Sequence, residues 1–251
     1  MRWIVPHLLG LCLALALCFV RADERQSADP VPTDDAEAMS RYRMSADAGD
    51  AEAMHNLGVM YEKGMGVPKD EAEAVRWFRK SADAGEARAM LDLGRAYENG
   101  RGVPKDDAEA VRWYRMSADA GDAKGMSFLG DMYLNGIGVP KDEAEAVRWY
   151  RKSADAGEAK AMFNLGLMYD NGRGVPKDEA EAVRWYRKSA DAGYAKGMFN
   201  LGVVYQNGQG VPKDEAEAVR WYRMSADAGY AAAMFNLGLM YEDGRDRTSV
   251  V

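Results

Sequence analysis

A unit of 36 residues recurs along most of this chain, and this period constrains the fold more than any other feature of the sequence. The tetrapeptide Val-Pro-Lys-Asp begins at positions that are each 36 residues apart, namely Val67, Val103, Val139, Val175 and Val211. The dipeptide Leu-Gly keeps the same period from Leu57 to Leu237, and Val31 opens a related tetrapeptide one unit earlier. Such a period is typical of arrays in which each unit packs only against its neighbours.

The first half of each unit predicts a leading helix. In the first complete unit this helix is expected from about Ala51 to Lys63, where Gly64 ends it in the left-handed conformation and Pro68 prevents its continuation. Apolar residues recur there at helical spacing. The predicted apolar stripe consists of Ala51, Met54, Leu57, Gly58 and Tyr61.

The second half predicts a trailing helix that opens at Asp70. Asp70 and Glu73 have the spacing of a capping box. In such a box the Asp side chain accepts a hydrogen bond from the backbone amide of the Glu, and the Glu side chain accepts one from the backbone amide of the Asp. Gly85 is expected to end the helix. One apolar face is predicted from Ala72, Val75, Phe78 and Ala82, and a second from Ala74 and Trp77. A helix that is apolar on two sides must be sandwiched between neighbours.

The unit as a whole resembles the Sel1-like repeat (SLR) family, a variant of the tetratricopeptide repeat with a longer loop. The motif runs Ala-x-Ala-Met-x-Asn-Leu-Gly-x-Met-Tyr-x-x-Gly-x-Gly-Val-Pro-Lys-Asp from Ala51 and closes with Ala-Val-Arg-Trp-Phe-Arg-Lys-Ser-Ala-Asp-Ala-Gly at Gly85. The resemblance implies an all-α fold, an α/α right-handed superhelix (solenoid) of stacked antiparallel helix pairs with about 12 helices. It also implies a role as an adaptor or scaffold.

The ends of the chain differ from the array. Residues 1–22 carry Arg2, an apolar run and small residues around Ala22, and are predicted to be a cleaved signal peptide. An uncleaved membrane anchor from Trp3 to Val20 and a lipoprotein signal at Cys18 are the alternatives. Residues 23–30 are expected to be a linker and 245–251 a disordered tail. The solenoid is expected over 31–244, in units of about 31–49, 50–85, 86–121, 122–157, 158–193, 194–229 and 230–244.

Composition limits the possible chemistry. Both cysteines, Cys12 and Cys18, lie in the predicted signal, so a cleaved chain has no disulfide and no thiolate. Its single histidine is then His55, no metal-ligand spacing occurs, and no catalytic residue, metal or cofactor is predicted. Loss of the positive charges of Arg2 and Arg21 would take the net charge from −7 to −9, which disfavours nucleic acid as a partner.

Comparison of the units with one another locates a candidate binding surface. The trailing helices are nearly identical, whereas variation concentrates in the leading helix, in the columns of Glu52, His55, Val59, Glu62 and Lys63, with Asn56 beside them. These positions share one helical face. Packing positions must repeat, so varying positions are expected to face solvent or a ligand. The resemblance to tetratricopeptide arrays implies that this face lines a concave groove.

Most of the candidate groove residues belong to an aromatic–amide–aliphatic series toward the C-terminus or to a basic row. The full set is Asn56, Arg88, Arg95, Lys124, Asp131, Lys160, Phe163, Asn164, Leu167, Lys196, Phe199, Asn200, Val203, Phe235, Asn236 and Leu239. The series would suit an extended peptide; alternatively, the Phe residues wedge between helices and the Asn residues satisfy local backbone. The basic row of Arg88, Lys124, Lys160 and Lys196 could bind carboxylates of a ligand, or it could only solvate the surface and complement nearby acidic residues.

The predicted function is a non-catalytic protein–protein interaction adaptor or scaffold, periplasmic or secreted, that binds a protein or peptide in this groove. Some disulfide-rich members of the family that this chain resembles bind or hydrolyse β-lactams. A β-lactam-binding or β-lactam-hydrolysing enzyme is therefore one alternative, although this chain lacks the paired cysteines of those proteins. The other alternative functions are binding of an envelope polysaccharide and self-assembly through the uncapped C-terminal helix.

Overall fold

The computed structural model describes residues 34–242, which form twelve α-helices and no strand. This confirms the predicted all-α class and the 36-residue period. The predicted signal peptide, linker and tail lie outside the described residues. The helices are α2 (Asp35–Asp47), α3 (Ala51–Lys63), α4 (Glu71–Asp83), α5 (Ala87–Asn99), α6 (Asp107–Asp119), α7 (Ala123–Asn135), α8 (Glu143–Asp155), α9 (Ala159–Asn171), α10 (Glu179–Asp191), α11 (Ala195–Asn207), α12 (Glu215–Asp227) and α13 (Ala231–Glu242).

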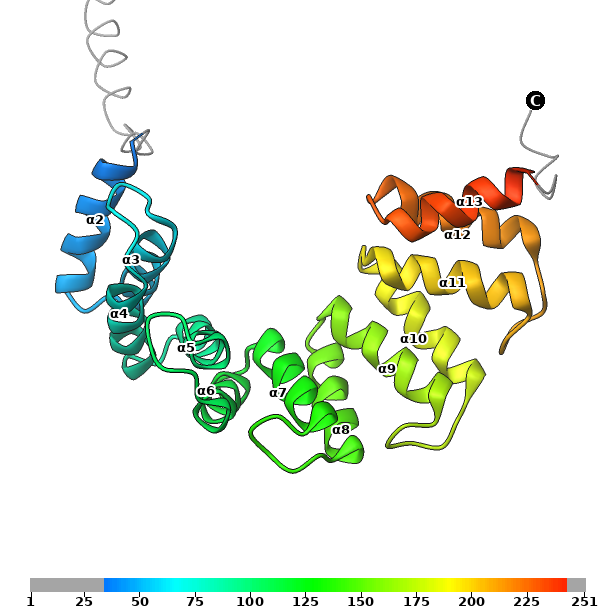
Figure 1. Cartoon of the computed structure of the whole chain (residues 1–251), viewed down its shortest axis with the longest axis horizontal. Coiled ribbons are helices and arrows are strands. Elements are labelled where there is room, and N and C mark those ends of the chain that lie inside the picture. The colour runs from blue at the N-terminus through cyan, green and yellow to red at the C-terminus, as the bar shows by residue number, and fades with distance from the viewer. Residues whose placement is uncertain (1–33, 243–251) are drawn as a thin grey trace, which may run out of the picture.

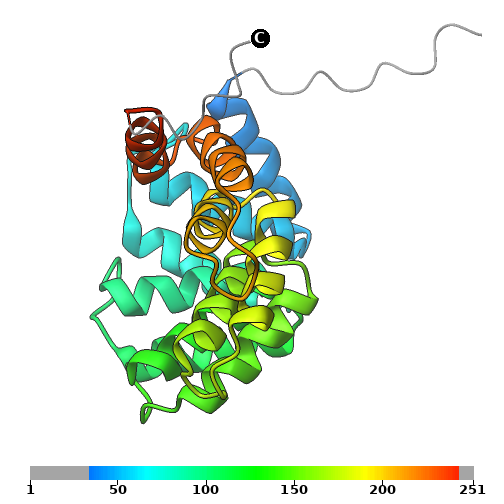
Figure 2. The ribbon, with the colours of Figure 1, turned by 90° about the vertical axis from the view of Figure 1, so that its right-hand side faces the viewer.

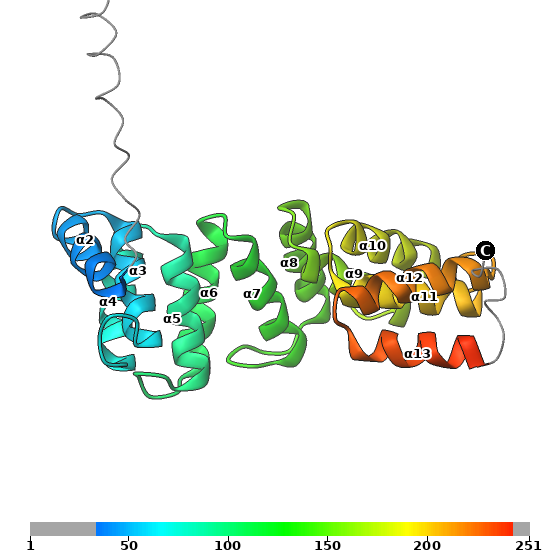
Figure 3. The ribbon, with the colours of Figure 1, turned by 90° about the horizontal axis from the view of Figure 1, so that it is seen from above.

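The helices stack pair upon pair into an open arc. Each odd-numbered helix from α3 to α13 is a leading helix, and each even-numbered helix is a trailing helix. The trailing helices α4 to α12 pack against the leading helices before and after them, whereas α2, the first described helix, packs against α3. Figures 1 and 2 show the stacked pairs following a curve. The leading helices α5 and α7 lie toward the opening of the arc, and α6 and α8 lie outside them (Figures 1 and 3). None of the helices between residues 34 and 242 is both long and apolar enough to cross a bilayer.

The boundaries of the leading helix follow from its caps, as predicted. Asp50 lies before α3 in an extended conformation, and its carboxylate accepts hydrogen bonds from the amides of Glu52 and Ala53 at 3.0 and 3.3 Å. Gly64 ends the helix with φ +72°, a backbone conformation that glycine adopts without strain. The local sequence therefore sets the length of the helix.

The trailing helix also begins where predicted, but only half of the expected capping box forms. The Asp70 carboxylate accepts the Glu73 amide at 2.9 Å. The Asp70 amide donates to the carbonyl of Tyr61, and the Glu73 carboxylate pairs with Arg76 at 2.9 Å. The reciprocal bond is therefore absent because both of its groups have other partners. At the far end, α4 stops at Asp83, before Gly85 turns the chain with φ +94°.

The trailing helices α4 to α12 are sandwiched between leading helices, which confirms that both of their apolar faces are covered. Trp77 is 8% exposed and packs with residues of α2 and α3, and Trp113 packs with residues of α4 and α5. The prediction that Ala72 belongs to a buried face is wrong, because this residue lies at the exposed start of the helix. In the leading helix the most buried positions include Ala53 and Met60, while the predicted Ala51, Met54 and Tyr61 are half-buried.

A glycine in each complete leading helix receives an aromatic ring from its trailing helix. Gly94 lies against the fully buried ring of Tyr114, and a Cβ at this position would be 2.4 Å from that ring. Gly58 accommodates Phe78 in the same way. The glycine lets the two helices approach closely although it weakens the isolated helix. This contact fixes the spacing within each pair, and thereby the position of the inner side chains.

Candidate ligand-binding surface

The candidate site is the surface formed by the varying columns of the leading helices. It is here called the inner surface because the leading helices α5 and α7 lie toward the opening of the arc (Figure 1). Neighbouring leading helices contact one another through its side chains. Arg88 of α5 reaches Glu52 of α3 at 3.1 Å, and Lys160 of α9 reaches Asp131 of α7 at 2.8 Å. The inner surface is thus continuous across successive units.

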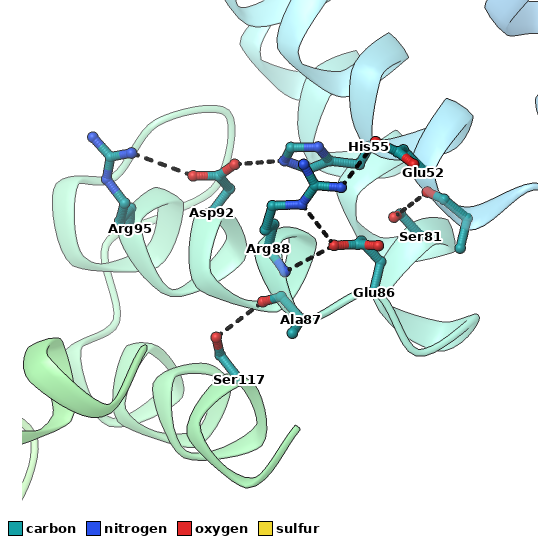
Figure 4. Close-up of polar contacts among 10 residues, drawn as sticks. Glu52, His55, Ser81, Glu86, Ala87, Arg88, Asp92, Arg95 and Ser117 are labelled. Carbon is teal, nitrogen blue, oxygen red and sulfur yellow. Dashed lines mark hydrogen bonds and ion pairs between the residues drawn. The ribbon is translucent and has the colours of Figure 1, made fainter. Parts of the chain in front are cut away.

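The N-terminal part of the inner surface is a network of ionic contacts (Figure 4). His55 Nε2 lies 2.9 Å from Asp92, whose other carboxylate oxygen accepts a hydrogen bond from Arg95 at 3.3 Å. Arg88 donates to both Glu52 and Glu86. Burial acts against ionisation of Glu86, but the hydrogen bonds from Arg88 lower the pKa of its carboxyl group. Two predicted ligand residues, Arg88 and Arg95, therefore already have acidic partners.

In the first three complete units the column of His55 is buried, contrary to the prediction that it faces solvent or a ligand. His55 is 8% exposed and its ring centroid lies 5.6 Å from that of Phe78 on the trailing helix. Leu91 and Ser127, which occupy the same column, are also buried. The side chains differ among units because each fills a different space beside the trailing helix. Variation among these three positions therefore reflects local packing.

The centre of the inner surface is organised by Asp131. Its carboxylate accepts hydrogen bonds from the Tyr150 hydroxyl at 2.6 Å, from Lys160 at 2.8 Å and from the Asn164 amide at 3.4 Å. Lys160 Nζ also lies 5.1 Å from the centroid of the Phe128 ring. Burial and the Asp131 charge raise the pKa of Tyr150. The structure thus brings together three predicted site residues, Asp131, Lys160 and Asn164.

A small hollow adjoins this cluster between α7, α8 and α9. It measures about 110 Å³ and is lined by Leu134, Tyr150, Asn164, Leu167, Met168, Asn171 and Arg173. Arg173 is paired with Glu143 at 2.9 Å at one side of the hollow. Leu167 is half-buried and packs against the neighbouring core cluster. The hollow presents an amide, a cation and aliphatic carbon within one small space.

The phenylalanines of the C-terminal half are wedged between helices. The centroid of the Phe163 ring lies 6.0 Å from that of Tyr186 and 5.5 Å from that of Tyr194. Phe199 lies 5.6 Å from Tyr222 and 5.3 Å from Tyr230 in the next unit. Both rings are half-buried. The wedge alternative therefore describes their packing, although each ring remains partly exposed.

The asparagines of the same series lie near buried tyrosine hydroxyls. Asn200 lies near Tyr186, whose hydroxyl donates to Asp170, and Asn236 lies near Tyr222, whose hydroxyl donates to Gln206. Burial raises the pKa of each of these tyrosines, and the asparagine contact acts in the opposite direction. Each amide thus lies beside a tyrosine of the preceding trailing helix.

The remaining predicted site residues differ in exposure. Lys124 and Lys196 are exposed and form no ion pair within residues 34–242. Asn56 and Val203 are half-buried. Phe235 and Leu239 of α13 are 67% and 44% exposed. The basic row is therefore split: Arg88 and Lys160 have acidic partners, whereas Lys124 and Lys196 are accessible to a ligand.

The sequence analysis missed the residues beneath the inner surface. Tyr114, Tyr150, Tyr186 and Tyr222 send their hydroxyls toward it from the trailing helices. Phe128 was missed because it occupies the column in which most units have an amide or acid. The signal available in the sequence was the regular recurrence of these tyrosines, each with a glycine in the leading helix of the same unit. Within residues 34–242 no three His, Cys, Asp or Glu side chains gather as a metal site.

One packing scheme, repeated from pair to pair, defines this protein as an α/α repeat solenoid. The chain belongs to the Sel1 repeat family: the model of that family, described as the Sel1 repeat, matches residues 51–86, 87–122, 123–158, 159–194, 195–230 and 231–250. Sel1 repeat proteins generally mediate protein–protein interactions and are generally non-enzymatic.

Solved structures agree with this assignment. A protective antigen present in uropathogenic Escherichia coli strains is 38% identical with a TM-score of 0.79, over 86% of this chain and 46% of the antigen. This chain thus spans about half of that protein. A Sel1 repeat protein from Oxalobacter formigenes is 33% identical with a TM-score of 0.75, over 88% and 92% of the two chains. An immunity protein from Pseudomonas aeruginosa is 20% identical, with a TM-score of 0.54 over 90% and 84%, and shares the fold. No curated protein sequence matches significantly.

Proposed function

We propose that this protein is a non-catalytic adaptor that binds an extended segment of a partner protein along its inner surface. The observation that carries the proposal is the gathering of most inter-unit variation on this one surface, while the packing residues repeat almost unchanged. Binding of protein partners is general in the Sel1 repeat family. A solenoid with an invariant frame and a variable inner face is suited to recognising a linear segment.

The exposed groups favour a partner segment that carries carboxylates. Lys124 and Lys196 are free to pair, and the hollow beside Asn164 and Leu167 provides room for one small side chain between them along the arc. The amide of Asn164 can accept or donate a hydrogen bond at this place. Charge-assisted hydrogen bonds from the two lysines would hold two carboxylates of the segment in place.

Site-specific photocrosslinking in the producing cell tests this proposal. A photoreactive side chain is placed at Lys124 or Lys196 on the inner surface. The matched controls are Lys152 and Lys188, which are exposed lysines of the trailing helices α8 and α10. One protein captured from both inner positions and from neither control is expected. Capture of that protein only from the control positions would contradict the proposed surface.

We also propose that the protein acts outside the cytosol, because residues 1–22 have the composition of an export signal. Cell fractionation, followed by mass spectrometry of the N-terminus, tests this point. A mature chain that begins at Asp23 in the periplasm or medium is expected. A membrane-bound chain that retains Trp3 to Val20 would favour the anchor, and an acylated Cys18 the lipoprotein.

The enzymatic alternative gains no support from the one histidine outside the predicted signal. His55 is buried, and its Nε2 is occupied by Asp92 at 2.9 Å. A general base must reach the proton of a bound substrate, which this side chain does not. Turnover of a chromogenic β-lactam by the purified protein would contradict a non-catalytic role.

A further inference from the structure

The two ends of the described array are complementary halves of one unit. The first described helix, α2, is a trailing helix, and the last, α13, is a leading helix. In the unit formed by α11 and α12, the two helices are joined by a defined set of contacts. The Tyr222 ring fills the space over Gly202, and the Ser225 hydroxyl donates to the carbonyl of Ala195 at 2.7 Å. Phe199 covers the same tyrosine.

In α13, the side chains and backbone that would contact a trailing helix of the same unit have no such helix against them within residues 34–242. A Cβ at Gly238 would meet no atom within 4 Å, whereas one at Gly202 would lie 2.5 Å from a tyrosine ring. Phe235, in the column of the half-buried Phe199, is 67% exposed. Leu239 and Met234 are exposed on the same helix. This helix therefore presents a glycine beside an apolar surface.

In α2 the trailing half is open. Tyr42, in the column of the fully buried Tyr222, is 37% exposed. The Ser45 hydroxyl donates to Asp50 at 2.8 Å, whereas the equivalent serines donate to a leading-helix carbonyl.

A hollow of about 660 Å³ lies beside α2, and its lining includes Tyr42, Ser45 and Arg41 of α2 and Asn56 of α3. In the complete units, a leading helix packs against the same side of the trailing helix. The hollow therefore has the position of a missing leading helix.

We propose that α13 of one molecule occupies this hollow in a second copy of the chain, so that a complete unit forms between two molecules. Tyr42 would then cover Gly238, and Ser45 would donate to the carbonyl of Ala231. The two surfaces differ, so the contact is head-to-tail and leaves a free end of each kind. The array then continues from one molecule into the next. This assembly extends the inner surface beyond a single chain and does not depend on the proposed partner.

The contact is weaker than an internal one, because Arg41 occupies the column of the buried Trp221. Trp221 is 3% exposed and lies beneath Arg187 at 5.6 Å. An arginine in this place covers less apolar surface and must be partly desolvated. We therefore expect reversible association that depends on protein concentration.

Two blocking variants distinguish this contact from other modes of association. Gly238→Leu fills the open space on α13, and Tyr42→Glu places a charge in the hollow of α2. A Cβ at position 238 meets no atom within 4 Å, and Tyr42 is partly exposed. Circular dichroism and urea unfolding verify the fold of each variant. Sedimentation velocity should show that the unaltered protein forms dimers and longer species as its concentration rises. Each variant alone should remain monomeric, and an equimolar mixture should form a dimer that grows no further.

Several results would overturn the proposal. One is an unaltered protein that stays monomeric to about 1 mM, the upper end of weak association. Another is a Gly238→Leu variant that still associates. A Tyr42→Glu variant that dimerises alone would indicate a symmetric contact between two α13 helices. As a gain-of-function test, Arg41→Trp should tighten the association about tenfold. That gain should disappear when Gly238→Leu is added.

Discussion

The hydroxyl group of Tyr150 donates a hydrogen bond of 2.6 Å to the carboxylate of Asp131, and this bond joins a trailing helix to the inner surface. The ring of Tyr150 is fully buried against Gly130, so only its hydroxyl reaches polar groups. Asp131 also receives Lys160 and Asn164 from the next leading helix. The same carboxylate therefore connects two neighbouring units and shapes the surface offered to a ligand.

Replacing Tyr150 by Phe should lower the free energy of unfolding by about 1–2 kcal/mol, because it removes a hydrogen bond to a charged acceptor. The ring itself should remain in place, since Phe78 occupies the equivalent position in the first complete unit. Urea unfolding followed by circular dichroism measures the difference. Tyr194→Phe is the matched control, because the Tyr194 hydroxyl has no hydrogen-bond partner within residues 34–242. Equal stability of the two variants would contradict the structural role of the hydroxyl.

The protein should lose stability in alkali. Burial raises the pKa of Tyr114, Tyr150 and Tyr186 above the ordinary value of 10.0. The folded state thus keeps protons that the unfolded chain releases near pH 10, so this stabilisation is complete below about pH 10 and falls as the pH rises further. Urea midpoints measured between about pH 8 and pH 11 should decrease above pH 10. Ultraviolet titration should show delayed ionisation of these tyrosines, and coincident titration with free tyrosine would contradict the prediction.

Two glycine-to-alanine changes at equivalent positions should have opposite effects. A Cβ at Gly166 would lie 2.4 Å from the Tyr186 ring, whereas one at Gly238 would meet nothing within 4 Å. Gly166→Ala should therefore lower the free energy of unfolding by about 1–2 kcal/mol, since overpacking outweighs the better helix propensity. Gly238→Ala should gain about 0.5–1 kcal/mol from helix propensity. Thermal unfolding of both variants at low concentration tests the pair, and a stabilised Gly166→Ala protein would show that the close contact is not limiting.

Charge reversal along the basic row should separate binding from stability. Lys124→Glu and Lys196→Glu should each change the free energy of unfolding by less than about 0.5 kcal/mol, because both side chains are exposed and unpaired. Both should weaken binding of the captured partner. Lys160→Glu should instead destabilise the protein by about 1 kcal/mol, since it sets a second carboxylate against Asp131. Unchanged partner affinity in the first two variants, measured by calorimetry, would remove these lysines from the site.

The sequence alone determined the helices and their order. Caps such as Asp70 and Gly64 act within a few residues of themselves, and the burial of Trp113 follows from an apolar column that recurs in the complete units. Both kinds of information are local or periodic, so they can be recognised without coordinates. The period also located the surface on which the units differ.

Only the tertiary structure decided which of those differing residues are accessible. His55 varies because it fills space beside Phe78, and Lys160 is engaged by a carboxylate 29 residues away. Such contacts depend on the distance between neighbouring helices, which is set by a buried tyrosine ring over a glycine. The openness of Gly238 and the hollow beside Tyr42 likewise appear only when the two ends are compared in space. Side-chain pairing across units is a property of packed surfaces, and a repeat pattern does not contain it.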